Sequence, residues 1–161
     1  MKKIVVLLIL ATIVSGLIAT PSSTHPYFEK YPGWYDPNTG KIHCWDKRTC
    51  LHEVVHKVDW ESKERQISTT KEYHKALGNY FIKLSEKEEL TDIELYYYNF
   101  PGVGAEYTED GWGGIHELYA EMFVVSEMFS NVDIPEEFRR FYNYAAIYNL
   151  WEQYPNIKSM L

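Results

Sequence analysis

The chain has 161 residues and carries 23 acidic against 16 basic side chains, a formal net charge of −7 at pH 7. This acidic excess argues against a nucleic-acid partner, because binding to phosphates depends on lysine and arginine. With 45% hydrophobic residues, 9 glycines and 7 prolines, the composition is that of an ordinary globular protein, and the length suits one domain rather than two.

The first 19 residues have the form of a signal peptide. Lys2 and Lys3 precede an apolar run over residues 4–19, and polar, turn-forming residues follow from Thr20. The run is shorter than the stretch of about 18 apolar residues that a membrane-spanning helix needs. We therefore expect cleavage after Ala19 and a secreted or otherwise extracytoplasmic protein with 14 basic and 23 acidic side chains, a net charge of −9. The alternative is an uncleaved segment that anchors the protein, and only then would the membrane be a partner.

Residues 20–48 predict an extended segment followed by a β-hairpin, in which two short aromatic-rich runs flank the turn formers of residues 36–40. The only cysteines, Cys44 and Cys50, lie six positions apart in a chain that we expect to be exported. This placement predicts a disulfide. The alternative is that both cysteines are metal ligands, although their spacing is unusual for zinc.

The next segment contains His-Glu-x-x-His within a helical pattern, and we expect this helix to end near Trp60. Its apolar residues recur at helical spacing: Leu51, Val54, Val55 and Val58. Residues four apart lie one above the other on a helix, so His52 and His56 can offer ring nitrogens to one zinc ion. Asp59 shares their face but lies about 10 Å along the helix from His52, so we expect it to support the site or cap the helix.

Two more helices and a loop are expected between this helix and the helix over residues 115–129. The first follows Thr70 and carries an apolar stripe, namely Tyr73, Ala76, Leu77, Tyr80, Phe81 and Leu84. A capping box at Thr91 and Glu94 begins a short helix that Pro101 ends. A glycine-rich loop that contains Tyr107 then leads to the next helix.

Residues 115–129 predict a helix that carries two acids beside its apolar face. Its main stripe is Leu118, Met122, Val125 and Phe129. Glu117 and Glu121 lie four residues apart on the adjoining line, where a carboxylate needs a cation or a partner because its desolvation is costly. A zinc ion on two histidines takes a third protein ligand, often Glu, so we expect Glu117 to bind the metal and Glu121 to accept the remaining N–H of a zinc-bound histidine. The alternative is that both acids merely edge a partly solvated helix.

The end of the chain predicts one closing helix. Residues 133–136 have the form of a capped helix start, and aromatic and apolar residues follow at helical spacing: Phe138, Phe141, Tyr142, Ala145, Tyr148 and Trp151. Together the elements predict an α+β fold that is mostly α, with a small hairpin, and one globular domain over residues 20–161.

Two of these helices, the one with His52 and His56 and the one with Glu117 and Glu121, resemble the zinc-binding helices of the gluzincins, a class of zinc peptidases. Residues 117–123, Glu-Leu-Tyr-Ala-Glu-Met-Phe, resemble the Glu-x-x-Ala-Glu-x-Phe helix of the anthrax lethal factor catalytic domain and of the secreted Pro-Pro endopeptidases. The resemblance implies a zincin-like catalytic domain over residues 49–161, with an active-site helix and a second ligand helix. It also implies a secreted metallopeptidase that acts on peptide or protein substrates.

Carried over to this sequence, the resemblance makes His52, His56 and Glu117 the ligands of one Zn²⁺. It makes Glu53 the general base that acts on a zinc-activated water, and it places Glu121 behind the ligands. The resemblance covers these two short helices only.

The same family places a tyrosine seven residues before the ligand glutamate, where this sequence has Asp110. Tyr107 is the nearest candidate for the group that stabilises the oxyanion, and His116 is an alternative. The lack of a clear oxyanion donor favours a second function, an exported zinc-binding or interaction module without turnover. A third possibility is a metal-free helical domain in which the motif occurs by chance.

Overall fold

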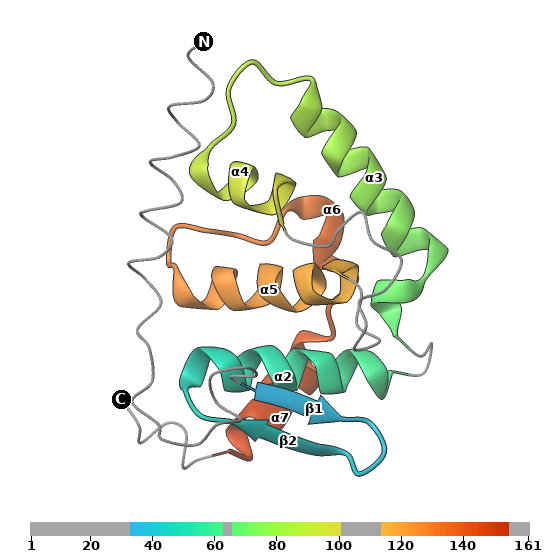
Figure 1. The fold of residues 1–161 in the computed structure, drawn as a ribbon, viewed down its shortest axis with the longest axis vertical. Helices are drawn as coiled ribbons and strands as arrows, with labels where there is room; N and C mark the ends of the chain where they lie inside the picture. Colours follow the sequence, from blue (N-terminus) through green and yellow to red (C-terminus); the bar gives the residue numbers. More distant parts are fainter. Residues whose placement is uncertain (1–32, 63–65, 101–113, 155–161) are drawn as a thin grey trace. The chain divides into compact units, whose positions relative to one another are not determined.

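The computed structural model describes residues 33–62, 66–100 and 114–154. The chain divides into two units, residues 1–31 and 32–161, and all of the described residues belong to the second. This unit has the expected α+β, mostly α, fold, and its elements follow one another as shown in Figure 1: β1 (Gly33–Asp36), β2 (Lys41–Cys44), α2 (Lys47–Trp60), the 3-10 turn η1 (Ile67–Thr69), α3 (Lys71–Ser85), α4 (Asp92–Tyr98), α5 (Gly114–Met128), α6 (Glu136–Arg139) and α7 (Tyr144–Glu152).

Several predictions fall on other parts of the chain. The signal peptide, the extended segment before the hairpin and Tyr107 lie outside the described residues. Within the described ranges, no helix combines the length and apolar character needed to cross a membrane.

The predicted hairpin is confirmed, and its turn is held by side-chain hydrogen bonds. Strands β1 and β2 pair antiparallel, with Asp36 opposite Lys41. The Asp36 carboxylate accepts hydrogen bonds from the Asn38 backbone N–H at 2.9 Å and the Thr39 hydroxyl at 2.7 Å. Gly40 closes the turn at φ +67°, a left-handed conformation that glycine adopts without steric cost.

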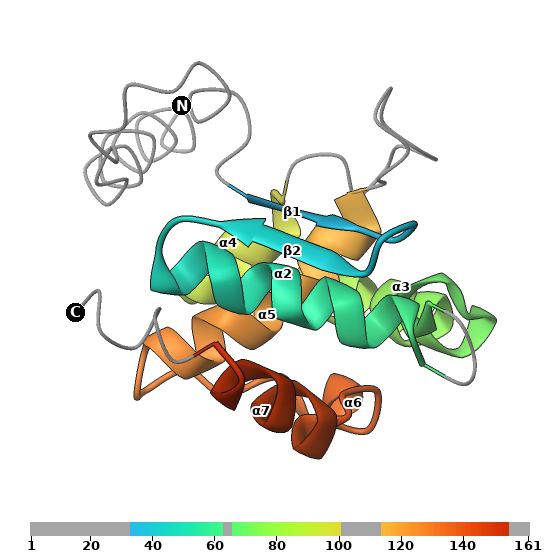
Figure 2. The same ribbon diagram turned by 90° about the horizontal axis from the view of Figure 1, so that it is seen from below.

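Strand β1 lies directly against α2 because residue 33 is a glycine. A Cβ atom at Gly33 would lie 2.4 Å from Cγ2 of Thr49 and 3.2 Å from Cγ of Glu53, so any other side chain would push the strand away. At the far end of the hairpin, the Lys57 ammonium donates to the Gly40 carbonyl at 2.9 Å. The hairpin therefore follows α2 from its first turn to its last, and α7 contacts α2 from the opposite side (Figure 2).

A disulfide ties the hairpin to the start of α2. Cys44 ends β2, Cys50 lies in the first turn of α2, and their Cα atoms are 5.0 Å apart. The bond joins the strands to a point two residues before His52.

Removing this disulfide is expected to lower the free energy of unfolding by about 2 kcal/mol, because the bond closes a short loop and so restricts the unfolded chain. Urea unfolding of the Cys44→Ser/Cys50→Ser double variant would measure the loss. The wild type treated with a reductant is the control and should lose the same amount. An unchanged midpoint in the double variant would refute the expected contribution.

Side chains cap the starts of α2 and α4. At α2 the N-cap is Asp46, whose carboxylate accepts the Thr49 backbone N–H at 2.9 Å and the Thr49 hydroxyl at 2.7 Å. The capping box of α4 at Thr91 and Glu94 is present, with each side chain bonded to the other residue's backbone N–H. Side chains thus satisfy backbone donors that the first turn leaves free.

The core surrounds α5, which lies between α4 and α2 in Figure 1. Every residue of α5 from Leu118 to Val125 is buried. Phe129, expected in the apolar stripe, is 46% exposed because the helix ends at Met128, one residue before it.

The prediction of a single closing helix is wrong. The chain forms a short helix, α6, then a turn, and α7 begins after Asn143, whose side chain accepts the Ala146 N–H at 3.1 Å. This cap restarts the helix, and the break turns Tyr142 into the core, where its hydroxyl donates to the Tyr119 carbonyl at 2.7 Å. Asp133 does not cap α6, which begins after Pro135 without a side-chain cap.

Candidate metal centre

Helices α2 and α5 lie side by side and bring three potential ligands together (Figure 1). Nε2 of His52 lies 3.0 Å from Nε2 of His56 and 2.9 Å from Oε2 of Glu117. Oε1 of Glu117 lies 3.4 Å from Nε2 of His56. Residues 65 positions apart in the sequence therefore present two imidazole nitrogens and a carboxylate to one point.

The donor set and its spacing fit zinc. A tetrahedral zinc with bonds of about 2.0–2.1 Å keeps its ligand atoms about 3.3 Å apart. The contacts in the cluster run from 2.9 to 3.4 Å, with different oxygens of Glu117 facing the two histidines, and one ligand atom from each residue lies within 4.8 Å of the others. Two histidines and one glutamate leave a fourth position for water or substrate, as catalytic zinc sites do.

Glu121 lies behind His52, on the side away from this point. Its carboxylate is buried, with Oε2 at 3.6 Å from Nδ1 of His52. Its Oε1 accepts hydrogen bonds from the Arg48 guanidinium and from the Tyr96 hydroxyl, the latter at 2.8 Å. The arrangement leaves Nε2 of His52 directed at Glu117 and His56.

The side chain of Glu53, a residue of α2, lies between that helix and the hairpin. It is buried, and its carboxylate accepts a hydrogen bond from the Tyr35 backbone N–H. Burial raises the pKa of Glu53, while the nearby imidazoles of His56 and His52 partly oppose this rise. A carboxylate with a raised pKa is a stronger base than an ordinary glutamate.

Asp59 has a supporting position and is not part of the ligand cluster. Its buried carboxylate accepts the Ser68 backbone N–H at 3.1 Å and the Ser68 hydroxyl at 2.5 Å, which fastens η1 to the end of α2. The Ser68 hydroxyl also lies 2.5 Å from Nδ1 of His116, the residue before Glu117. Asp59 thus links the two ligand helices through a serine.

His116, the alternative oxyanion donor, is buried in this network. Burial lowers the pKa of its imidazole, and the carboxylate of Asp59, 4.0 Å away, partly counters that effect. Tyr107, the first candidate, lies outside the described residues.

Without a metal ion, the carboxylates around His52 favour the doubly protonated, cationic form of its imidazole. Burial alone would lower its pKa, but hydrogen bonds to Glu117 and Glu121 raise the pKa to about 10. Burial would raise the pKa of Glu117, yet hydrogen bonds to His52 and His56 outweigh it and hold that pKa below its usual range. A metal cation must therefore displace the His52 proton, whose charge it would replace.

Zinc binding near pH 7.5 is accordingly expected to release about one proton, and the affinity is expected to fall about tenfold for each unit by which the pH is lowered. The sign follows from a His52 pKa above the working pH, because the protonated imidazole cannot bind zinc. Isothermal titration calorimetry in two buffers of different ionisation enthalpy, at one pH, measures the released proton. Binding enthalpies that agree between the two buffers would contradict the expectation.

Sequence reasoning missed Arg48, Ser68 and Tyr96. Arg48 lies four residues before His52 and eight before His56, so its place on the histidine line was a usable signal. Tyr96 belongs to a run of three tyrosines, of which Tyr97 is buried and Tyr98 is exposed. The run alone does not tell which ring reaches Glu121.

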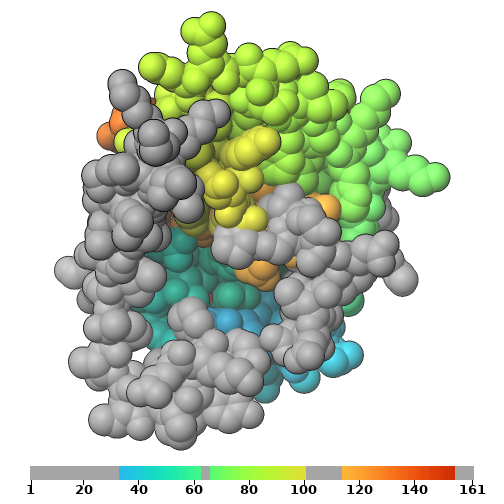
Figure 3. All heavy atoms as spheres, turned by 45° about the horizontal axis from the view of Figure 1, so that its top comes forward, coloured from blue at the N-terminus to red at the C-terminus, as the bar shows by residue number. Residues whose placement is uncertain are grey.

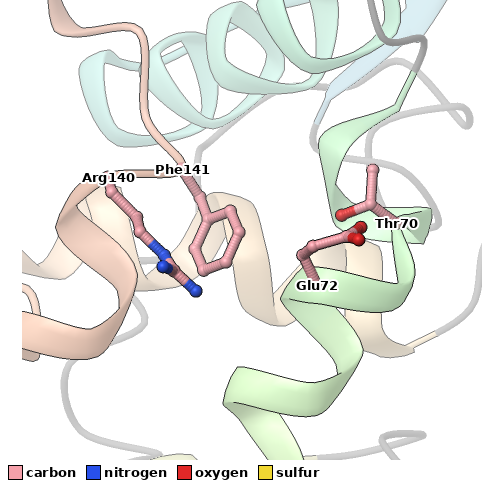
Figure 4. A pocket seen from close by; sticks show the side chains of 4 residues that line it. All are labelled: Thr70, Glu72, Arg140 and Phe141. Carbon is pink, nitrogen blue, oxygen red and sulfur yellow. The ribbon is translucent and has the colours of Figure 1, made fainter.

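Figures 3 and 4 show two separate parts of the molecule. On the face shown in Figure 3, atoms of α2 (teal), β1 (blue), α4 (yellow) and α5 (orange) gather in one area. Elsewhere, an open pocket is lined by Thr70 and Glu72 on one side and by Arg140 and Phe141 on the other (Figure 4). None of these four residues belongs to the cluster.

No protein-family model, no curated protein and no solved structure matches the chain.

Proposed function

We propose that the protein is a zinc-dependent peptidase of the zincin type, with His52, His56 and Glu117 as the metal ligands. The observation that carries the proposal is the convergence of two Nε2 atoms and one carboxylate at distances of 2.9 to 3.4 Å.

The remaining residues match the needs of peptide hydrolysis. A zinc ion at this point would polarise a peptide carbonyl and lower the pKa of a water molecule. Glu53 would accept a proton from the attacking water and pass it to the departing amine, a role that its raised pKa favours. Glu121 would hold the His52 ring through Nδ1.

The hairpin suggests where an extended substrate lies. The Tyr35 N–H points to Glu53, so the edge of β1 that does not pair with β2 runs beside the proposed base. Zinc peptidases commonly bind extended peptides by main-chain hydrogen bonds to such an edge.

The test is a joint measurement of zinc content and of cleavage of a mixed peptide library, before and after treatment with a chelator. The proposal predicts one zinc per chain, cleavage that the chelator abolishes, and recovery of cleavage when zinc is restored. Zinc without cleavage of any peptide would favour the binding module without turnover. A protein that binds no zinc would refute both.

A further inference from the structure

Glu121 is a buried carboxylate beside the cluster, and other side chains face both of its oxygens. Oε2 faces Nδ1 of His52 at 3.6 Å. Oε1 accepts from two groups on different elements, Arg48 in the first turn of α2 and Tyr96 on α4. The two donors hold one oxygen and leave the other for the histidine.

We propose that Arg48 and Tyr96 are positioning residues that act on the metal centre through Glu121. This inference rests on the proposed zinc site and names two residues that set its affinity. They fix the Glu121 carboxylate so that it accepts the Nδ1–H of His52, which keeps Nε2 of that ring aimed at the metal.

Charge balance supports a role for Arg48. Glu53, Glu117 and Glu121 place three carboxylates around a site that would hold one divalent cation. Zinc leaves one negative charge uncompensated, and the Arg48 guanidinium balances it.

The exposure of Arg48 separates this role from simple packing. Its side chain is 52% exposed, whereas that of Glu121 is 4% exposed. Truncating Arg48 therefore removes a half-exposed side chain and leaves the buried residues of α2 in place. Tyr96 allows a second test. Replacing it with phenylalanine removes the hydroxyl that reaches Glu121 and keeps the ring that packs on Phe100.

A double-mutant cycle on zinc affinity tests the inference, with dissociation constants measured by competition against a chromogenic chelator. Arg48→Met is expected to weaken zinc binding about tenfold in the wild-type background, as loss of a partner behind a metal ligand does. In the Glu121→Gln background the same change should alter affinity less than about twofold, because Arg48 no longer has a carboxylate to position. Tyr96→Phe should act in the same direction, and Arg48→Lys should restore part of the loss.

Matched controls come from neighbouring residues. Lys47→Met removes a cation from the same turn of α2, and Tyr98→Phe removes an exposed hydroxyl from α4. Both should leave zinc affinity unchanged. Thermal unfolding of the zinc-free variants shows whether each folds, and Tyr96→Phe carries the test if Arg48→Met does not.

The outcomes separate this inference from the proposed function. A wild type that binds no zinc overturns both. If the wild type binds zinc, an equal loss from Arg48→Met in the two backgrounds, or no loss in the wild-type background, overturns the positioning role and leaves the zinc site standing.

Discussion

Replacing Glu53 with glutamine is expected to slow peptide cleavage by about 10²- to 10⁴-fold, the usual contribution of a general base, while the protein still binds one zinc ion. Glutamine has nearly the same size and can accept the hydrogen bond that the Tyr35 N–H gives to Glu53. It cannot take up a proton. Glu53 is not among the clustered ligand atoms, so the metal should remain.

Zinc content and kcat for a cleaved peptide are measured together in this experiment. Glu61→Gln is the matched control, since Glu61 follows the same helix, is exposed and pairs with Lys57 at its surface. It should cleave at the wild-type rate. A Glu53→Gln protein that keeps full activity, or one that loses its zinc, would contradict the assigned role.

Replacing Glu117 with glutamine is expected to weaken zinc binding more than about 100-fold, and to abolish cleavage with it. Changes to groups behind a metal ligand typically cost 10- to 100-fold, and Glu117 is assigned as a ligand itself. The two histidines that remain give an incomplete site for zinc. The fold should survive because the Glu117 side chain is 39% exposed.

Chelator competition measures the affinity of this variant. Glu127→Gln offers the control on the same helix, because Glu127 is exposed and its carboxylate accepts a hydrogen bond from the Tyr148 hydroxyl at the surface. Its zinc affinity should match that of the wild type. Wild-type affinity in Glu117→Gln would remove Glu117 from the ligand set.

Local signals predicted most of the elements. Helical spacing placed α2, α3 and α5, a capping box placed α4, and turn formers placed the hairpin. The break after α6 was missed because the aromatic residues continue at helical spacing through it. Asn143 stops the helix there by capping the next one, a signal that the apolar pattern concealed.

The candidate site was predicted by a different kind of argument. His52 and His56 follow from spacing on one helix, but their meeting with Glu117 was inferred from the cost of leaving a carboxylate without a cation. Periodicity does not tell which residues from other helices will reach a buried acid. Periodicity could therefore not identify Tyr96 and Ser68, because each acts through a contact that only the packing of α4 or η1 creates.

The central claim is that two histidines of α2 and one glutamate of α5 hold a single zinc ion. X-ray absorption at the zinc edge tests it most directly, on protein loaded with one equivalent of zinc. The account predicts two imidazole nitrogens and oxygen ligands, all at about 2.0–2.2 Å, with no sulfur in the shell. A shell that contains sulfur, a shell without imidazole, or protein that fails to retain one zinc per chain would contradict it.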